Sequence, residues 1–417
     1  PQWLRELRTE GLERFAAAGF PSTRQEEWRF TSVQPIAEAP FVLTGGDPAA
    51  VDRHAAHRFE LCEAGRHLLV FANGRYAPEL SSVAGLPEGV RVGSLAAALR
   101  ESGDLVRQYL GAAARSAGSP FGALNTAFIA DGAFVYVAPG VRMDEPVQFL
   151  YLTAPGADLL ATNPRSLIVV DRMARVSIVE TYGGVGTGMY WTNAVTEVLV
   201  ADGARADVYR VQREAETAFH TAVTCTVQGR DSSVHLHPVA FGASLSRHDI
   251  HIVMDGENGH SILNGLYLLG GRQHCDHHTT IDHARPHNES HEYMNGVLDG
   301  EAHSVFTGRI IVRPGAQRTD SKQTNNNLVL SEQARADSQP QLEIYADDVK
   351  CTHGATLGPL DEKALFYLRS RGIDPVHARS LLTYGFGAEI IDRMEIAPLQ
   401  AQLDRLVRQR LLGGHVR

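Results

Sequence analysis

The sequence predicts a mainly β protein whose core lies between helical ends. Apolar residues recur with helical spacing in residues 1–18 and again after Gly358. From about Asn125 to His353 this spacing disappears, and short β-branched or alternating runs are interrupted every few residues by Gly, Asp and Asn. A weak motif, a small residue followed by alternating apolar positions, also repeats there. These observations predict a β core of residues 123–358, preceded by a mixed region at 1–122 and followed by a helical domain at 359–417.

The overall composition is that of an ordinary folded protein. Its 417 residues are 43% hydrophobic and 21% charged, which is enough to bury a large core. The formal net charge of -9 and the lack of basic runs argue against nucleic acid or a membrane surface as a partner. No apolar stretch approaches about 18 residues and no signal-peptide pattern opens the sequence, so we expect a soluble cytoplasmic protein. The four cysteines are widely spaced without a C-x-x-C motif, which suits a reducing compartment; they are Cys62, Cys225, Cys275 and Cys351.

The N-terminal region is predicted to mix helices and short strands. Residues 1–18 form an amphipathic helix, and Gly19 follows at the position of a C-terminal cap. The apolar stripe of this helix consists of Trp3, Leu4, Leu7, Leu12 and Phe15. Residues 67–72 are typical of a strand, and residues 95–114 are typical of a helix.

The repeated motif of the β region has near-regular spacing. It begins at Ala174, Ala204, Ser232, Gly259 and Ala302, so successive starts differ by 30, 28, 27 and 43 residues. Strand units at such spacing without intervening helices predict a solenoid, that is, a parallel β-helix. An antiparallel sandwich accounts for the spacing equally well, so the periodicity leaves both folds open.

Helix signals define the C-terminal domain. Asp361 is placed to cap a helix that carries Leu365 and stops at Gly372. Asp374 followed by proline predicts a second helix start. A last apolar stripe consists of Leu399, Leu403, Leu406 and Val407. We expect these residues to form a helical bundle.

The sequence lacks the common nucleotide-binding and hydrolase motifs. There is no G-x-x-x-x-G-K-[ST] and no G-x-S-x-G. A glycine cluster at residues 183–188 is followed by Met189 and Tyr190 rather than by a lysine that reaches phosphates, so it is interpreted as a flexible turn. The chain is therefore predicted not to be a P-loop ATPase.

One short segment offers three kinds of metal ligand. Residues 345–353 read as a strand, and its two-residue period places Asp347, Cys351 and His353 on one face. Thiolate, imidazole and carboxylate suit Fe(II), Zn(II) or an iron-sulfur cluster. Because the set is only a partial site, a structural role for these residues stays open beside a ligand role.

A second concentration of candidate ligands runs from His274 to His291. Alternation places His274, Asp276 and His278 on one strand face, with Cys275 and His277 on the other. This spacing fits a metal site, and it fits a polar solenoid surface or a subunit contact equally well. His235 and His237 also share a face, whereas His248 and His251 would do so only across a bulge.

Seven segments together resemble the SufB/SufD family of the SUF iron-sulfur cluster assembly system. The most specific is residues 340–358, which ends in KCTHGATLG, followed by residues 366–373. The others are residues 23–31, 124–128, 296–300, 305–308 and 319–328. The resemblance covers nearly the whole chain. Within the family, the KCTHGATLG strand and the short N-terminal region look like the SufD branch rather than the SufB branch.

The resemblance implies a right-handed parallel β-helix between helical N- and C-terminal parts. It also implies a non-catalytic scaffold subunit that pairs with SufB about a pseudo-twofold axis and docks a SufC ATPase on its C-terminal helices. His353 matches a family histidine that joins a SufB cysteine in building the cluster, and Cys351 matches a cysteine whose role is less clear. The expected cargo is iron or a transient iron-sulfur cluster shared with SufB, and the assembled complex is expected to bind reduced flavin but no ATP on this chain. Whether the isolated chain forms a homodimer stays open.

Two other function classes are consistent with a β-helix. A polysaccharide-active enzyme would use Asp347 and Asp348 as acid and base, but aromatic residues for sugar stacking make up only 7% of the chain. A purely structural solenoid would carry no site at all. Co-purification with an ATPase would separate the assembly scaffold from both.

Overall fold

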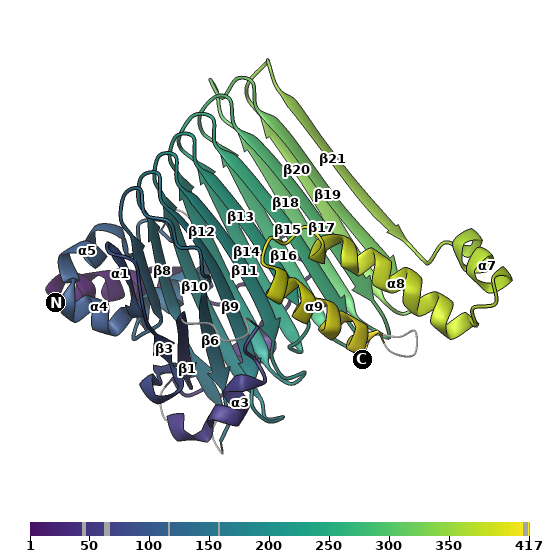
Figure 1. Ribbon diagram of the computed structural model, residues 1–417, viewed down its shortest axis with the longest axis horizontal. Helices are drawn as coiled ribbons and strands as arrows, with labels where there is room; N and C mark the ends of the chain where they lie inside the picture. Colours follow the sequence, from purple (N-terminus) through teal and green to yellow (C-terminus); the bar gives the residue numbers. More distant parts are fainter. Residues whose placement is uncertain (44–46, 62–66, 116, 157–158, 412–415, 417) are drawn as a thin grey trace.

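The computed structural model describes residues 1–43, 47–61, 67–115, 117–156, 159–411 and 416. Its centre is a two-sheet parallel solenoid, in which each coil contributes one strand to each sheet (Figure 1). Sheet A contains β4 (Val90–Ser94), β5 (Ala133–Val137), β7 (Leu160–Thr162), β8 (Arg165–Val170), β10 (Tyr190–Val200), β12 (Phe219–Gln228), β14 (Leu245–Met254), β16 (His274–His283), β18 (His303–Val312) and β20 (Arg335–Ile344). Sheet B contains β1 (His67–Ala72), β2 (Arg75–Tyr76), β3 (Ser82–Val83), β6 (Val147–Thr153), β9 (Arg175–Gly184), β11 (Arg205–Arg213), β13 (Ser233–Ala240), β15 (His260–Leu269), β17 (Glu289–Leu298), β19 (Asp320–Val329) and β21 (Lys350–Gly358).

The parallel pairing confirms the β-helix prediction and excludes the sandwich. Neighbouring strands from β8 to β20 in sheet A, and from β6 to β21 in sheet B, all pair in parallel. Antiparallel pairs occur only at the N-terminal end of the described structure, where β2 and β3 flank β1 and β4 flanks β5.

Four of the five predicted motif starts occupy equivalent positions in the solenoid, and the fifth does not. Arg175, Arg205, Ser233 and His260 are partners in successive coils, so the first four motif starts occupy equivalent corners before sheet B. The fifth start, Ala302, precedes β18 of sheet A, and the equivalent corner residue is Asn288. Small residues occur at corners before both sheets, so the sequence pattern does not reveal a shift of half a coil.

Between the sheets, the core changes from apolar to polar along the solenoid. In the early coils the inward side chains include Val176, Ile178 and Val208, all buried. Each such fully buried aliphatic side chain stabilises the fold by about 1.5–3 kcal/mol. In the late coils the same ladder positions carry polar side chains such as Ser290 and Gln323, also buried.

The N-terminal helices cover sheet A, except for α3, which packs against β1 and β6 of sheet B. Their bounds are α1 (Gln2–Ala18), α2 (Gln34–Glu38), α3 (Arg53–His57), α4 (Leu95–Glu101), α5 (Gly103–Tyr109) and α6 (Pro120–Ala127), with short 3-10 turns η1 (Glu26–Trp28), η2 (Pro48–Ala50) and η3 (Pro78–Leu80). Gly19, with φ 67°, follows the end of α1 as its C-terminal cap, as expected. Its predicted apolar stripe is wrong at Leu12, which is 52% exposed, because α6 packs against Gly11. A side chain at Gly11 would lie 2.7 Å from the backbone nitrogen of Ala127.

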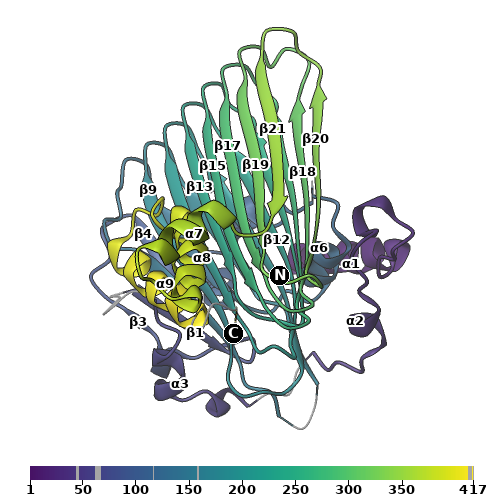
Figure 2. The ribbon, with the colours of Figure 1, turned by 90° about the vertical axis from the view of Figure 1, so that its right-hand side faces the viewer.

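The predicted helix at residues 95–114 is divided. Helix α4 ends at Glu101 and α5 begins at Gly103, because Ser102 adopts a non-helical conformation with φ -139° and ψ 38°. Figure 2 places α1, α2 and α6 on the side of the molecule opposite the C-terminal helices.

The C-terminal helices are α7 (Glu362–Ser370), α8 (Pro375–Ile391) and α9 (Ala397–Arg410). The predicted caps are present, since the Asp361 and Asp374 side chains accept bonds from the first backbone N–H groups of α7 and α8. These helices do not form an independent bundle. Helices α8 and α9 pack on the outer face of sheet B, where Ile390 and Leu403 share one apolar cluster with Tyr209 and Leu266. Helix α7 projects away from the solenoid (Figure 1). Within the described residues, no helix is both long and apolar enough to cross a membrane.

Candidate functional site

Cys351 and His353 lie together at the open end of the solenoid. Both belong to β21, the last strand of sheet B, and they pair in register with Ser321 and Gln323 of β19. They continue the ladders that face inward in earlier coils, so the predicted shared face is present. Because no further coil covers them, Cys351 is only partly buried and His353 is exposed.

Asp347 does not join this pair on the strand. Residues 345–353 are not one strand, since β20 ends at Ile344 and β21 begins at Lys350. The intervening turn stacks on the turn of the previous coil: the backbone N–H of Asp348 donates to Gln317 Oε1 at 2.8 Å, and Ala346 is buried in the core. The alternation of side chains therefore breaks at this corner, and Asp347 and Asp348 are exposed there.

The thiol of Cys351 is not activated by its surroundings. Partial burial raises its pKa above the ordinary value, and the Asp320 carboxylate raises it further. At neutral pH this residue is a thiol, and a cation at the site is needed to make it a thiolate.

Two buried polar residues lie in the ladder beneath His353. Gln323 is its partner in β19, and Glu292 is the partner of Gln323 in β17. Gln323 Nε2 donates to Glu292 Oε2 at 2.7 Å, while Glu292 Oε1 and Gln323 Oε1 have no hydrogen-bond partner among the described residues. Burial raises the pKa of Glu292 to about 7. This pair was not predicted from the sequence, although both residues lie at whole-coil intervals before His353.

The second predicted group, His274, Asp276 and His278, lies on the outward face of β16, as alternation predicted. Asp276 Oδ2 accepts bonds from Arg247 Nη1 at 2.7 Å and from the hydroxyl of Thr31 at 2.5 Å. His274 Nε2 lies 2.9 Å from the same hydroxyl. The group thereby joins the N-terminal segment to sheet A.

The charges around this group favour that structural role. Burial alone would raise the pKa of Asp276, but the Arg247 guanidinium outweighs it and holds this pKa below the ordinary value. Burial lowers the pKa of His274 to about 4 and also lowers that of His278. The imidazoles are neutral, but the cation beside Asp276 is already Arg247, so a metal ion would have to displace it.

The remaining candidate ligands of β14 and β16 divide between the two faces of sheet A. Cys275 and His277 point inward as predicted, with Cys275 Sγ 3.6 Å from His277 Nδ1. His248 bonds inward to Thr224, whereas His251 lines an outer cleft, so no bulge brings those two together. The position of Cys62 falls outside the described residues.

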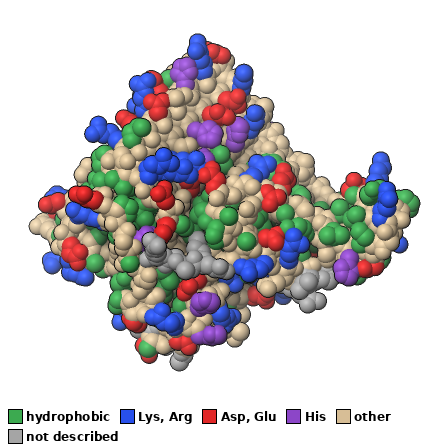
Figure 3. All heavy atoms as spheres, in the orientation of Figure 1, with side chains coloured by type: hydrophobic (Ala, Val, Ile, Leu, Met, Phe, Trp, Pro, Cys, Tyr) green, Lys and Arg blue, Asp and Glu red, His purple; other side chains and the backbone are tan. Residues whose placement is uncertain are grey.

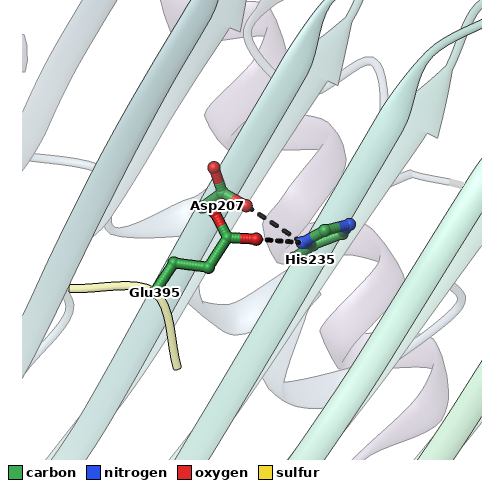
Figure 4. A group of neighbouring side chains, drawn as sticks. All are labelled: Asp207, His235 and Glu395. Carbon is green, nitrogen blue, oxygen red and sulfur yellow. Dashed lines mark ion pairs between the residues drawn. The ribbon is translucent and has the colours of Figure 1, made fainter. Parts of the chain in front are cut away.

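A group that was not predicted from the sequence lies on the outer face of sheet B (Figure 4). Asp207 and His235 come from neighbouring strands, and Glu395 reaches them from the segment between α8 and α9. His235 Nδ1 lies 3.1 Å from Asp207 Oδ1 and 4.0 Å from Glu395 Oε1. The two strand residues follow the coil spacing, but nothing in the sequence predicts that Glu395 lies against them.

Two arginines neutralise both carboxylates of this group. Arg205 Nη2 lies 2.7 Å from Asp207 Oδ1 and 2.5 Å from Glu395 Oε1, and Arg175 Nη2 lies 3.1 Å from Glu395 Oε2. Burial would raise the pKa of Asp207, but hydrogen bonds from His235 and Arg205 hold it below its ordinary value. A divalent cation here would face two guanidinium groups. The group therefore fastens the α8–α9 connection to the sheet.

Exposed apolar side chains gather at two places away from these charged groups. Ile344, Tyr345 and Leu357 are exposed beside the open end of the solenoid. Phe366 and Tyr367 of α7 are 73% and 56% exposed, and Val376 and Leu381 of α8 are exposed as well. Hydrophobic side chains are visible on the projecting part of the molecule in Figure 3. Exposed apolar patches of this kind mark contact surfaces.

Comparison with known proteins gives two family matches that together span most of the chain. Residues 152–386 match the SufBD core domain of SUF-system FeS cluster assembly, and residues 1–149 match the SufBD protein N-terminal region. An iron-sulfur cluster assembly SufBD family protein of Synechocystis is 37% identical over 398 residues, which cover 93% of this chain and 86% of the relative. The iron-sulfur cluster assembly proteins SufD of Escherichia coli and Bacillus subtilis are each 28% identical, over 99% of this chain and 97% and 94% of their own lengths.

Proposed function

The chain belongs to the SufBD family of iron-sulfur cluster assembly proteins, and on this premise we propose that it is a scaffold subunit that forms the assembly site together with a SufB-type partner. One observation carries the proposal. The solenoid ends in an uncovered strand that presents an imidazole and a thiol, His353 and Cys351, from its inward-facing ladder. A second solenoid placed against this end would enclose them.

The terminal coil supports a protein partner at that end. Strands β20 and β21 are the last strands of their sheets, so each presents an unpaired edge of backbone N–H and C=O groups. Ile344, Tyr345 and Leu357 add apolar side chains to the same end. Edge pairing combined with apolar burial suits a SufB-type chain of the same architecture.

In this proposal iron and sulfide are cargo, held between the two subunits. His353 supplies an imidazole, which is a common ligand for iron. Cys351 ligates only after a bound cation lowers the raised pKa of its thiol. The SufB-type partner therefore supplies the principal thiolate, and Cys351 has the lesser role.

The projecting surface of α7 and α8 suits a SufC-type ATPase. Its aromatic side chains, Phe366 and Tyr367, are of the kind that dominates protein interfaces. The ion pairs of Glu395 fasten the adjoining helices to sheet B, so movement of a docked ATPase would be transmitted to the solenoid. The chain itself is proposed to be an accessory, non-catalytic subunit.

Co-expression tests this function. Tagged chain is produced with SufB-type and SufC-type proteins from the same genome, purified anaerobically, and analysed for subunit ratio, iron and sulfide. We expect one stable complex containing all three proteins, with cluster on the complex and none on the chain purified alone. A stoichiometric cluster on the isolated chain, or the failure of both proteins to co-purify, would contradict the proposal.

A further inference from the structure

Three arginines from distant parts of the sequence lie near one another at the C-terminal end of strand β11 in sheet B. Arg58 follows α3, Arg213 is the last residue of β11, and Arg410 is the last residue of α9. Arg213 Nη1 donates to the backbone oxygen of Arg58 at 3.3 Å. The Arg410 guanidinium lies over the ring of Phe241, and the backbone N–H of Phe241 donates at 2.9 Å to the backbone oxygen of Gln212, which precedes Arg213. The N-terminal region, the solenoid and the C-terminal helices therefore each contribute one positive charge.

Aromatic rings support two of these guanidinium groups. The Arg213 guanidinium lies 5.0 Å from the ring centre of Phe59, and that of Arg410 lies 5.7 Å from the ring centre of Phe241. Both rings are buried. Both arginine side chains are partly buried, whereas Arg58 is exposed. The rings restrict the orientations of the guanidinium groups.

No acidic side chain balances this positive charge. Over the described ranges, none of the three arginines has a carboxylate oxygen within the 4.0 Å of an ion pair. Other buried or partly buried arginines of the two sheets do have acidic partners. Arg205 of sheet B and Arg247 of sheet A each contact two carboxylates. Burying a charge without a partner is costly, so an uncompensated cluster requires an anion from elsewhere.

The pKa values of two of these arginines are lowered, as expected for guanidinium groups that are partly buried without an acidic partner. Burial, together with the charges of Arg410 and Arg58, lowers the pKa of Arg213 to about 10. Burial also lowers the pKa of Arg410, and the nearby Glu216 only partly opposes this. Arg410 Nη1 is buried and has no hydrogen-bond partner within the described structure.

We propose that Arg213 and Arg410, with Arg58 at the rim, form a binding site for the phosphate group of a small molecule. Planar guanidinium groups present pairs of N–H donors that match the oxygens of a phosphate, and two or three such groups around one anion are typical of phosphate recognition. Donors that are partly buried between three elements suit a small anion better than a protein surface. The site is separate from the open end of the solenoid, and it does not depend on the proposed assembly function.

Thermal unfolding and calorimetry of the full chain test the site, with inorganic phosphate as the probe and sodium chloride at equal ionic strength as the reference. We expect a saturable rise in melting temperature with phosphate and none with chloride. Arg213→Gln and Arg410→Gln should each weaken phosphate binding by at least about tenfold. Without phosphate, both variants should melt no lower than the wild type, because each removes an unpaired charge. Arg405→Gln, an exposed change on α9, should leave phosphate binding unchanged.

Several results would overturn the proposal. These are a chloride response equal to the phosphate response, phosphate binding retained in the Arg213→Gln, Arg410→Gln double variant, or stabilisation by an acidic peptide but not by phosphate. If Arg213→Gln does not fold, Arg410→Gln and Arg58→Gln carry the same test. Pyrophosphate and ADP, measured in parallel, distinguish free phosphate from a nucleotide as the source of the anion.

Discussion

At the residue scale, the chemistry of this chain depends on which side chains the last coil leaves uncovered. Cys351 and His353 occupy inward-facing ladder positions that earlier coils fill with buried residues such as Ser290 and Leu263. Two-residue alternation was enough to predict that they share a face. It failed for Asp347, because corner positions are set by stacking on the previous coil rather than by strand periodicity.

His353→Ala should reduce the cluster content of the co-purified complex by at least about tenfold, since even residues that support a metal ligand usually cost that much when removed. Folding should be unaffected because the side chain is exposed. Cys351→Ser should have a smaller effect, because its thiol has a raised pKa. Iron and sulfide analysis of each complex measures the difference, and Thr352→Ala, on the opposite face of β21, is the control. If the His353→Ala complex contains a normal amount of cluster, His353 is not a ligand and serves only as a contact residue.

Glu292 should make the stability of the chain depend on pH. Its folded pKa of about 7 lies above its ordinary value, so the unfolded chain releases this proton first. The stability associated with the protonated carboxyl is fully present below about pH 4.5 and is lost as the pH rises toward 7. Glu292→Gln should remove this loss, which makes the variant more stable than the wild type at pH 8 by on the order of 3 kcal/mol.

Urea unfolding of both proteins between pH 4.5 and 8 measures the Glu292 effect. The difference between them should grow with pH up to about 7 and then level off. A constant difference across this range would show that Glu292 does not titrate in it.

At the scale of secondary-structure elements, helix ends were predicted reliably and long-range contacts were not. The caps at Asp361 and Asp374 and the stop at Gly19 are present because each depends only on its neighbours in sequence. The approach of α6 to Gly11, and of Glu395 to Arg205, joins residues more than one hundred positions apart. A single sequence contains no record of those pairings.

Glu395→Gln should loosen the connection between α8 and α9. The change removes the negative charge that Arg175 and Arg205 hold, so hydrogen exchange in α8 and α9 should quicken. Because Glu395 is half exposed, the expected cost is only about 0.5–1 kcal/mol. Glu362→Gln, on α7, is the matched control. Unchanged exchange in the Glu395→Gln chain would mean that apolar packing alone holds these helices.

At the scale of the whole molecule, repetition in the sequence indicated a solenoid but did not distinguish it from a sandwich, because both place strands at regular intervals. The deciding property is parallel pairing between coils, which joins residues that lie 30 positions apart in the pairing of β9 with β11. The C-terminal helices were expected to bury their own apolar stripe. They instead share a core with sheet B, which includes Val179, Tyr209 and Leu266.

This shared core determines how ATPase docking has to be tested. Removal of residues 373–417 should expose the outer face of sheet B and lower the stability of the solenoid, so lost binding by that truncated chain would be ambiguous.

Phe366→Glu instead changes one side chain that is 73% exposed, and it should leave the melting temperature within about 2 °C of the wild type. If α7 is the docking surface, the loss of a central aromatic contact should weaken SufC binding by about 2 kcal/mol, roughly thirtyfold. Calorimetric titration of SufC into each chain measures this, with Lys363→Glu on the same helix as the control for added negative charge. Equal affinities for Phe366→Glu and the wild type would place the ATPase elsewhere on the molecule.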